Sequence, residues 1–328
     1  MNKKNIVYLF PGQGAQYSGM AMDLLSSDAV KSLFDTASEI FGKDVKELLQ
    51  SDADTLKSTE VSQPAITVAN LAAAAFLGEK GYSPAACAGF SLGEYAALVC
   101  AGIINTADCL RLVKARGEAM RKTADRLREE ALQSGGGNDA SVPGMAAVVG
   151  LSPKQAEELI AQWKEAASLT AGVRDLYAAN INSPVQLAVS GTAAALAEAE
   201  PLFKEAGARR FIRLQVAGPF HSPLMADAAE AFRPVLEAVV FNDPVIPVFS
   251  NVTGKQILSG EDAKKFALLQ ITSPVRWVEE EAAIAAAGIE ACLEVGPGKV
   301  LQGLWKDSGS ELPYYPAGTV EDILKLDQ

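Results

Sequence analysis

Short apolar runs alternate with helical patterns along the first part of the chain. Residues 6–10 form a continuous apolar run that ends at Pro-Gly, which is typical of a strand buried on both faces. An alanine-rich helical pattern covers residues 64–77, and a long amphipathic pattern covers residues 106–131. Thr106 is the expected N-cap of that long helix, with Cys109 standing where a capping box would place a glutamate.

A glycine-rich segment at residues 134–139 interrupts this pattern and predicts a flexible linker. The order of elements after it is strand, helix, strand, strand, helix, strand, as in the ferredoxin-like split motif. The strands are expected at residues 145–149, 176–181, 185–189 and 210–215, and the helices at residues 152–163 and 192–206. The sequence therefore predicts an inserted ferredoxin-like (βαββαβ) small subdomain over residues 140–216.

The last third of the chain returns to alternating strands and helices. Strands are expected at residues 245–249 and 291–295, and helices at residues 263–270, 277–286 and 299–306. This alternation indicates an α/β fold with helices on both faces of a mostly parallel sheet. We expect an α/β-hydrolase-like core formed by residues 1–135 and 217–328.

A short motif marks a candidate nucleophile. Gly-Phe-Ser-Leu-Gly at residues 89–93 follows a small apolar run and precedes a helix-forming run. This is the layout of a nucleophile elbow, which needs its glycines because larger side chains would collide in so tight a turn. The motif predicts that Ser91 is a nucleophile beside backbone N–H groups that can stabilise an oxyanion. The alternative is a glycine-rich structural turn.

His221 is the only histidine in the sequence. A nucleophilic serine needs a neighbouring base, and if that base is an imidazole it can only be His221. The alternative is a loop or core histidine held by a backbone carbonyl. Asp227 and Asp243 lie near His221 in the sequence, but nothing in the sequence shows that either orients it.

Arg116 falls on the apolar stripe of the helix expected at residues 106–131. A buried guanidinium needs a carboxylate partner, because an unpaired buried charge is costly. The partner is either an Asp or Glu of the chain or the carboxylate of a substrate, which the planar fork of arginine binds in a bidentate manner.

Two glycine-containing turns do not match nucleotide-binding motifs. Residues 11–16 lack the third glycine of the dinucleotide fingerprint, and residues 296–300 lack the first glycine and the Ser/Thr of a P-loop. The loop at residues 11–16 fits either a backbone oxyanion donor or a plain turn at the end of a strand.

Composition narrows the function classes. The 328 residues carry a formal charge of −11, which argues against nucleic acid as a partner. The apolar run near the N-terminus is too short for a signal peptide, and no later stretch is expected to span a membrane. The four cysteines have no C-x-x-C spacing and indicate reduced packing residues, and a single histidine leaves little to build a metal site. We expect a cytoplasmic protein.

Together these residues resemble the malonyl-CoA:acyl-carrier-protein transacylase family over essentially the whole chain. The shared motifs occur in the same order, at residues 10–16, 91–95, 116–117, 180–184, 218–222, 251–254, 274–277 and 294–298. The resemblance implies ping-pong transfer of a malonyl group from malonyl-CoA to the phosphopantetheine thiol of acyl carrier protein, in fatty acid or polyketide synthesis. It implies no metal or redox cofactor, and we expect a monomer.

The resemblance also implies roles for particular residues. Ser91 would be the nucleophile, and His221 would be the base that later returns its proton to the leaving thiol. Backbone N–H groups of Gln13 and Leu92 would form the oxyanion hole. Arg116 would bind the malonyl carboxylate.

Three further residues take roles from the same resemblance. The backbone carbonyl of Gln270 would orient the histidine, which would explain why no acid is evident. Asn182 would lie in the substrate pocket, and Phe220 resembles the residue of malonyl-selecting members. The chain departs from the family in having Phe90, where histidine is usual, and a longer segment at residues 121–143.

Two other functions compete with this expectation. A thioesterase or esterase could use the same serine and histidine with water as acceptor, but a hydrolase of neutral acyl groups has no use for Arg116 on an apolar face. A catalytically silent module that binds a carrier protein is disfavoured because Ser91 and His221 are both present.

Overall fold

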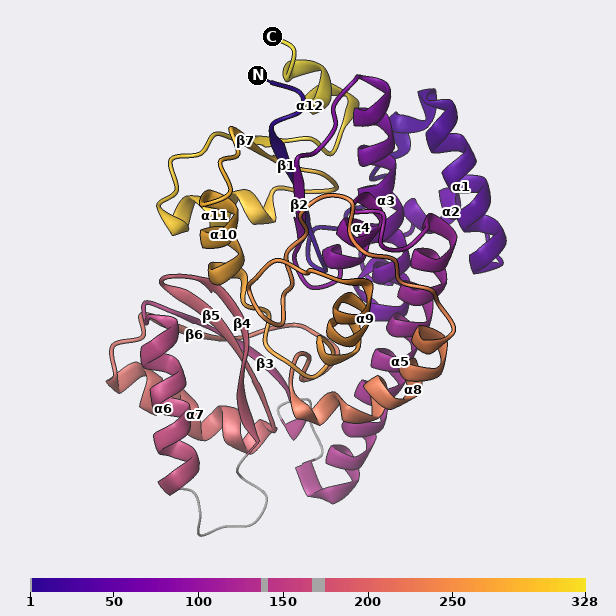
Figure 1. The fold of residues 1–328 in the computed structure, drawn as a ribbon. Coiled ribbons are helices and arrows are strands. Elements are labelled where there is room, and N and C mark those ends of the chain that lie inside the picture. The colour runs from indigo at the N-terminus through magenta and orange to yellow at the C-terminus, as the bar shows by residue number, and fades with distance from the viewer. Residues whose placement is uncertain (1, 137–140, 167–174) are drawn as a thin grey trace.

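The computed structural model describes residues 2–136, 141–166 and 175–328, and shows a mixed α/β fold with two separate sheets (Figure 1). The first sheet is parallel, with strand order β2-β1-β7-β8. Its strands are β1 (Ile6–Phe10), β2 (Ala86–Gly89), β7 (Ala291–Glu294) and β8 (Tyr314–Pro316).

Strand β1 is central in this sheet, and every residue in it is buried, as its continuous apolar run predicts. Its side chains alternate between two cores: Tyr8 and Phe10 pack in one cluster, and Val7 and Leu9 pack in the other. Helices therefore cover both faces. The helices of this larger part of the molecule are α1 (Asp28–Phe41), α2 (Val45–Leu49), α3 (Thr59–Glu79), α4 (Gly93–Cys100), α5 (Thr106–Ala131), α8 (Ala226–Glu237), α9 (Gly260–Leu269), α10 (Trp277–Ala285), α11 (Val300–Ser308) and α12 (Val320–Lys325).

The second sheet is antiparallel, with strand order β4-β5-β3-β6. Its strands are β3 (Gly144–Val149), β4 (Leu176–Ser183), β5 (Gln186–Gly191) and β6 (Arg210–Arg213). Helices α6 (Pro153–Ala166) and α7 (Ala193–Glu205) pack with one face of this sheet in a separate core. Met145 and Ala188 instead join the core of the parallel sheet, so the other face meets the larger part of the molecule.

The predicted strand at residues 245–249 is wrong. Only isolated bridges form there, pairing Val248 with Cys87 and Phe249 with Gln256. Pro244 and Pro247 lack a backbone N–H, so this segment cannot continue a ladder along β2.

The long helix α5 has the predicted bounds, but its N-cap is Asn105 rather than Thr106. The side chain of Asn105 accepts a hydrogen bond from the N–H of Asp108 at 2.8 Å, and its amide donates to the Asp108 carboxylate at 2.8 Å. Shifting the cap by one residue puts an acid at the third helical position, where it accepts from the side-chain amide of Asn105 and not from the backbone N–H that a capping box uses.

Helix α3 begins at Thr59, before the predicted residue 64. The hydrophobic pattern missed this first turn because it is polar, although Thr59 and Ser62 are buried. That turn packs against Gly117 of α5, where a Cβ would lie 3.1 Å from the carbonyl oxygen of Thr59. Helix α3 has the length and apolarity of a membrane span, but 78% of the apolar window is buried in the protein, so it serves as a core helix. The predicted linker at residues 134–139 starts inside the π-helical turn η3 (Leu132–Gly136), and its remainder lies outside the described residues.

Candidate active site

Ser91 lies in a tight turn between β2 and α4. Its φ of 50° is in the left-handed region, which is rarely populated by residues with a side chain. A Cβ added to Gly89 would collide with the backbone of Gly93, and one added to Gly93 would collide with the carbonyl of Phe10. These contacts explain the glycines of the motif, since strand β1, strand β2 and the start of α4 approach too closely for side chains.

His221 is positioned to act on Ser91. Its Nε2 lies 2.8 Å from the Ser91 Oγ, and its Nδ1 lies 2.9 Å from the backbone carbonyl oxygen of Gln270. A carbonyl can only accept, so Nδ1 carries the proton and Nε2 is free to accept the serine proton. Neither nearby acid orients this ring: Asp227 pairs with Arg126 at 2.7 Å, and Asp243 accepts from the N–H of Gly260.

The imidazole is held neutral by its surroundings. His221 is 5% exposed, and burial lowers its pKa to about 4, helped by the positive charge of Arg116. The hydrogen bond to Gln270 opposes this shift without reversing it. At neutral pH the ring is therefore an unprotonated base.

Arg116 is 1% exposed and comes from the middle of α5. Its guanidinium donates to the Oε1 atoms of Gln63 at 2.8 Å and of Gln270 at 3.0 Å, and lies 5.6 Å from the ring centre of Tyr95. Across residues 2–136, 141–166 and 175–328 it forms no ion pair with a carboxylate, so of the two partners expected the internal Asp or Glu is absent there, and neutral amides hold the guanidinium. These amides orient its charge, and the buried Glu94 acts on that charge through space without forming an ion pair.

Gln270 joins these groups, because its backbone holds His221 while its side-chain oxygen holds Arg116. Its Nε2 lies 3.0 Å from the carbonyl oxygen of Ser91 and 3.1 Å from Oε2 of Glu94. A single buried residue, through its backbone carbonyl and its side chain, therefore sets the serine turn, the histidine and the arginine relative to one another.

Behind Gln270 lies a buried network. Glu94 accepts from the N–H of Asn251 at 2.8 Å, and the Asn251 amide donates to the Gly89 carbonyl and to Glu280, both at 2.7 Å. Burial raises the pKa of Glu94 to about 7 and that of Glu280 well above its ordinary value. The network fixes the end of β2 against the residues that carry Gln270.

The loop after β1 packs over the serine turn. A Cβ on Gly12 would collide with the carbonyl of Phe90 and lie 3.6 Å from the backbone nitrogen of Leu92. Within the described part of the chain, the N–H groups of Gln13 and Leu92 donate to no protein acceptor. Two backbone donors are thus available in adjacent loops at the serine.

Comparison with known proteins places this geometry in a family. Residues 7–323 match the model of the acyl transferase domain family. The chain belongs to the acyl transferase domain family. Over 97% of its length, this acyl transferase is 38% identical to the malonyl CoA-acyl carrier protein transacylase of Bacillus subtilis (strain 168), covering 95% of that protein. It is also 37% identical to the transacylase of that name from Escherichia coli (strain K12), over 91% of each chain.

Solved structures agree with the sequence comparison. The acyl carrier protein S-malonyltransferase of Vibrio cholerae superposes with a TM-score of 0.87 at 35% identity, covering 98% of this chain and 99% of the other. A malonyl-transacylase in complex with its type II PKS acyl-carrier protein has a TM-score of 0.85 at 33% identity, with 98% of each chain covered. The resemblance found in the sequence motifs is therefore confirmed.

Two residues expected in the substrate pocket of this acyl transferase make no hydrogen bond to the serine among the described residues. Asn182 is half-buried in β4, and its Oδ1 is buried without a partner. Phe220 is buried in the main core, and its carbonyl accepts from Ser190 at 2.5 Å. Phe90 is half-buried beside Ser91 and packs edge-on against Trp277 at 5.5 Å.

Sequence reasoning missed Gln63, Glu94 and Asn251 as supporting residues. Glu94 and Asn251 stand in motifs that the chain shares with the family, but they contact each other across 157 positions of the sequence. In the described parts of this acyl transferase, no group of three or more His, Cys, Asp and Glu side chains is placed to hold a metal ion.

Proposed function

We propose that this protein transfers a malonyl group from malonyl-CoA to the phosphopantetheine thiol of acyl carrier protein, in fatty acid or polyketide synthesis. One observation carries the proposal: Gln270 holds both the Ser91–His221 pair and a buried arginine that has no carboxylate partner among the described residues. The relatives' names add the substrate class.

The first half-reaction makes a malonyl-serine ester. His221 Nε2 takes the Ser91 proton as Oγ attacks the thioester carbon, and the oxyanion that forms accepts from the N–H groups of Gln13 and Leu92. The C–S bond then breaks, and His221 returns the proton to the sulfur of coenzyme A. The pair ends neutral, as it began.

The second half-reaction runs the same steps with the carrier thiol. His221 takes the thiol proton as the sulfur attacks the ester carbonyl, and the C–O bond to Ser91 breaks. The proton then returns to Ser91 Oγ, so the enzyme is regenerated. No net charge is gained or lost in either half-reaction.

Arg116 distinguishes malonyl from neutral acyl groups. Gln63 and Gln270 accept from its guanidinium without cancelling the charge, so a substrate carboxylate can supply the missing anion. We include Asn182 and Phe220 as lining residues of the same pocket. A hydrolase of neutral acyl groups would gain nothing from this buried charge.

Release of coenzyme A from malonyl-CoA, measured with and without phosphopantetheinylated carrier protein, tests the proposal. Transfer predicts at most one equivalent of release per chain without carrier, and further release that depends on the carrier and is matched by an equal amount of malonyl-carrier product. Carrier-independent release with free malonate as product would make the protein a thioesterase and would contradict the proposal.

We further propose a division of the chain into a catalytic subdomain, residues 1–135 and 217–328, and a small subdomain, residues 140–216. The order β3-α6-β4-β5-α7-β6 and the strand order β4-β5-β3-β6 support describing the small subdomain as ferredoxin-like. The parallel sheet with its serine turn supports an α/β-hydrolase-like catalytic subdomain. A cytoplasmic monomer without metal or redox cofactor remains our prediction.

A further inference from the structure

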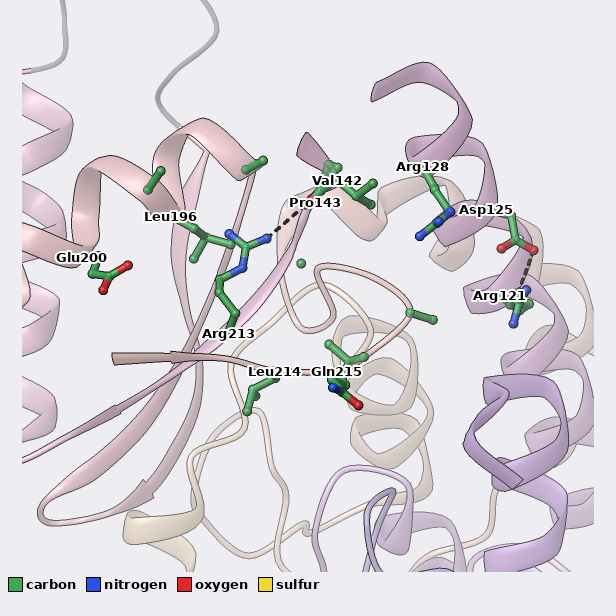
Figure 2. Close-up of a pocket in the computed structure, with 15 residues that line it drawn as sticks. Arg121, Asp125, Arg128, Val142, Pro143, Leu196, Glu200, Arg213, Leu214 and Gln215 are labelled. Carbon is green, nitrogen blue, oxygen red and sulfur yellow. Dashed lines mark hydrogen bonds and ion pairs between the residues drawn. The ribbon is translucent and has the colours of Figure 1, made fainter. Parts of the chain in front are cut away.

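Two arginines of α5 that reach the surface are paired with carboxylates of the same helix, whereas Arg116 is not. Arg111 pairs with Asp108 at 2.8 Å, and Arg121 pairs with Asp125 at 2.7 Å on the wall of a cavity that no proposed catalytic residue lines (Figure 2). Burial of a positive charge with no anion nearby is costly. The guanidinium of Arg116 therefore needs a counter-charge from another element.

Glu94, in the first turn of α4, is the carboxyl group that acts on the charge of Arg116. Its side chain is 1% exposed, and its negative charge stabilises the guanidinium through space. The side-chain amide of Gln270 lies between the two groups: its Oε1 accepts from Arg116 Nη2 at 3.0 Å, and its Nε2 donates to Glu94 Oε2 at 3.1 Å. One buried amide group therefore separates the two charges, in surroundings where charges interact more strongly than in water.

The carboxyl group of Glu94 can accept a proton without losing a hydrogen bond. Its Oε2 accepts from the backbone N–H of Asn251 at 2.8 Å and from Gln270. Its Oε1 is buried and has no hydrogen-bond partner within the described part of the chain, so a proton added there leaves the bonds of Oε2 in place. Burial raises the pKa of Glu94 to about 7, so both protonation states are populated near neutral pH.

The other titratable groups around Arg116 keep their charge state near neutral pH. His221 is neutral above its pKa of about 4, and burial raises the pKa of Tyr95, so its phenol stays protonated. Burial, and then the charge of Glu94, hold the pKa of Glu280 in α10 well above its ordinary value. Glu94 therefore ionises before Glu280 and is the group that changes the charge beside Arg116.

We propose that Glu94 is the counter-charge of Arg116 in the free enzyme, and that it takes up a proton from solvent at Oε1 when a malonyl carboxylate binds the guanidinium. The inference rests on the proposed malonyl transfer. Two carboxylates beside one buried cation leave a net negative charge, which burial disfavours, and protonation of Glu94 restores one anion per cation. Glu94 acts through Arg116 and Gln270, so it is a positioning residue that adjusts the preference for malonyl.

The proposal gives the preference for malonyl a pH dependence of known sign. A second anion beside Glu94 raises its pKa, so the malonyl group binds best while Glu94 is protonated and binds less well as the pH rises above 7. The ratio of kcat/KM for malonyl-CoA to that for acetyl-CoA should fall by about tenfold between about pH 6 and pH 9, for a pKa shift of about one unit. Acetyl-CoA is the reference because it shares the coenzyme A phosphates and the Ser91–His221 pair.

Matched variants assign this pH dependence. Glu94→Gln resembles the protonated residue, so it should hold the ratio near the wild-type value of low pH at every pH. Glu281→Gln is the control, because Glu281 in α10 is also a buried carboxyl, and burial raises its pKa to about 8. The carboxyl oxygens of Glu281 make no hydrogen bond across the described ranges, so this variant should keep the wild-type fall in the ratio.

Proton uptake tests the same coupling without a variant. Thioester exchange on Ser91 consumes no net proton, so any uptake that accompanies malonylation belongs to a group that titrates. With a pH indicator in weak buffer at about pH 7.5, malonylation of the wild type should take up about half a proton per chain for a tenfold coupling. Acetylation of the same protein should take up none.

The outcomes separate this inference from the proposed function. A malonyl-serine that forms with a pH-independent malonyl-to-acetyl ratio and no proton uptake would overturn the role of Glu94 and leave malonyl transfer standing. An equal fall of the ratio in Glu94→Gln and in the wild type would also overturn it. Failure of the wild type to form any malonyl-serine would overturn both. If Glu94→Gln does not fold, the wild-type ratio and the proton uptake still decide.

Discussion

Replacing Arg116 with alanine should convert a malonyl-selective enzyme into one that prefers neutral acyl groups. The guanidinium is fully buried and held by two amide oxygens, so a bound malonyl carboxylate would meet a desolvated, pre-oriented cation. Removing one partner of such a buried charge pair costs about 3–5 kcal/mol, which corresponds to about 10²–10³-fold or more in rate. Acetyl-CoA has no carboxylate, so its transfer should change by only about threefold.

The assay is kcat/KM for acylation by malonyl-CoA and by acetyl-CoA, measured in parallel. Arg111→Ala is the matched control, since it removes an exposed arginine of the same helix that pairs with Asp108. Arg116→Lys keeps a charge but cannot reach both amides, so it should retain the malonyl preference in weakened form. An unchanged malonyl-to-acetyl ratio in a folded Arg116→Ala variant would refute the carboxylate-binding role.

Three other predictions concern the surroundings of the serine. As the pH is lowered, kcat/KM for malonyl transfer should decrease only near pH 4, because the neutral imidazole of His221 is the active form and its pKa is lowered to about 4. A decrease that already begins at pH 6–7 would contradict this. Burial raises the pKa of Glu94 from 4.5 to about 7, so its contribution to stability is present at low pH and lost as pH rises through that window. Chemical denaturation should therefore show a flatter pH dependence for Glu94→Gln between pH 4.5 and 7 than for the wild type, and parallel curves would count against it. Gly93→Ala should lose about 3 kcal/mol or more of unfolding free energy, because the added Cβ would collide with the Phe10 carbonyl. Gly78→Ala is the control: this position in α3 has open space around it, so the substitution should leave stability unchanged or raise it. Similar losses in both variants would be inconsistent with the packing.

Local patterns predicted the parts of the site that lie within single elements. The serine turn follows from two glycines and a short apolar approach, and the place of Arg116 follows from the stripe of one helix. Periodicity also predicted the bounds of α5, because 26 residues give a strong helical signal. Short or polar segments were missed. Strand β8 has only three residues, too few to show a period, and the first turn of α3 is polar and so does not continue the apolar pattern of the rest of that helix.

Long-range contacts could not be predicted in this way. The hydrogen bond between Ser91 and His221 joins residues 130 positions apart, and Gln270 reaches Arg116 across 154. That amides rather than a carboxylate surround the guanidinium depends on how α3, α5 and the end of α9 pack. No periodicity within one segment contains that information.

The most direct test of the account is the mass of the intact protein after mixing with malonyl-CoA, followed by mapping of the modified peptide. We predict one malonyl group per chain, located on Ser91 and absent in Ser91→Ala. His221→Ala should form it about 10²–10⁴-fold more slowly. The group should leave when phosphopantetheinylated carrier protein is added and persist with carrier lacking that arm. A malonyl group on another residue, or release of coenzyme A with no adduct and no need for carrier, would contradict the account.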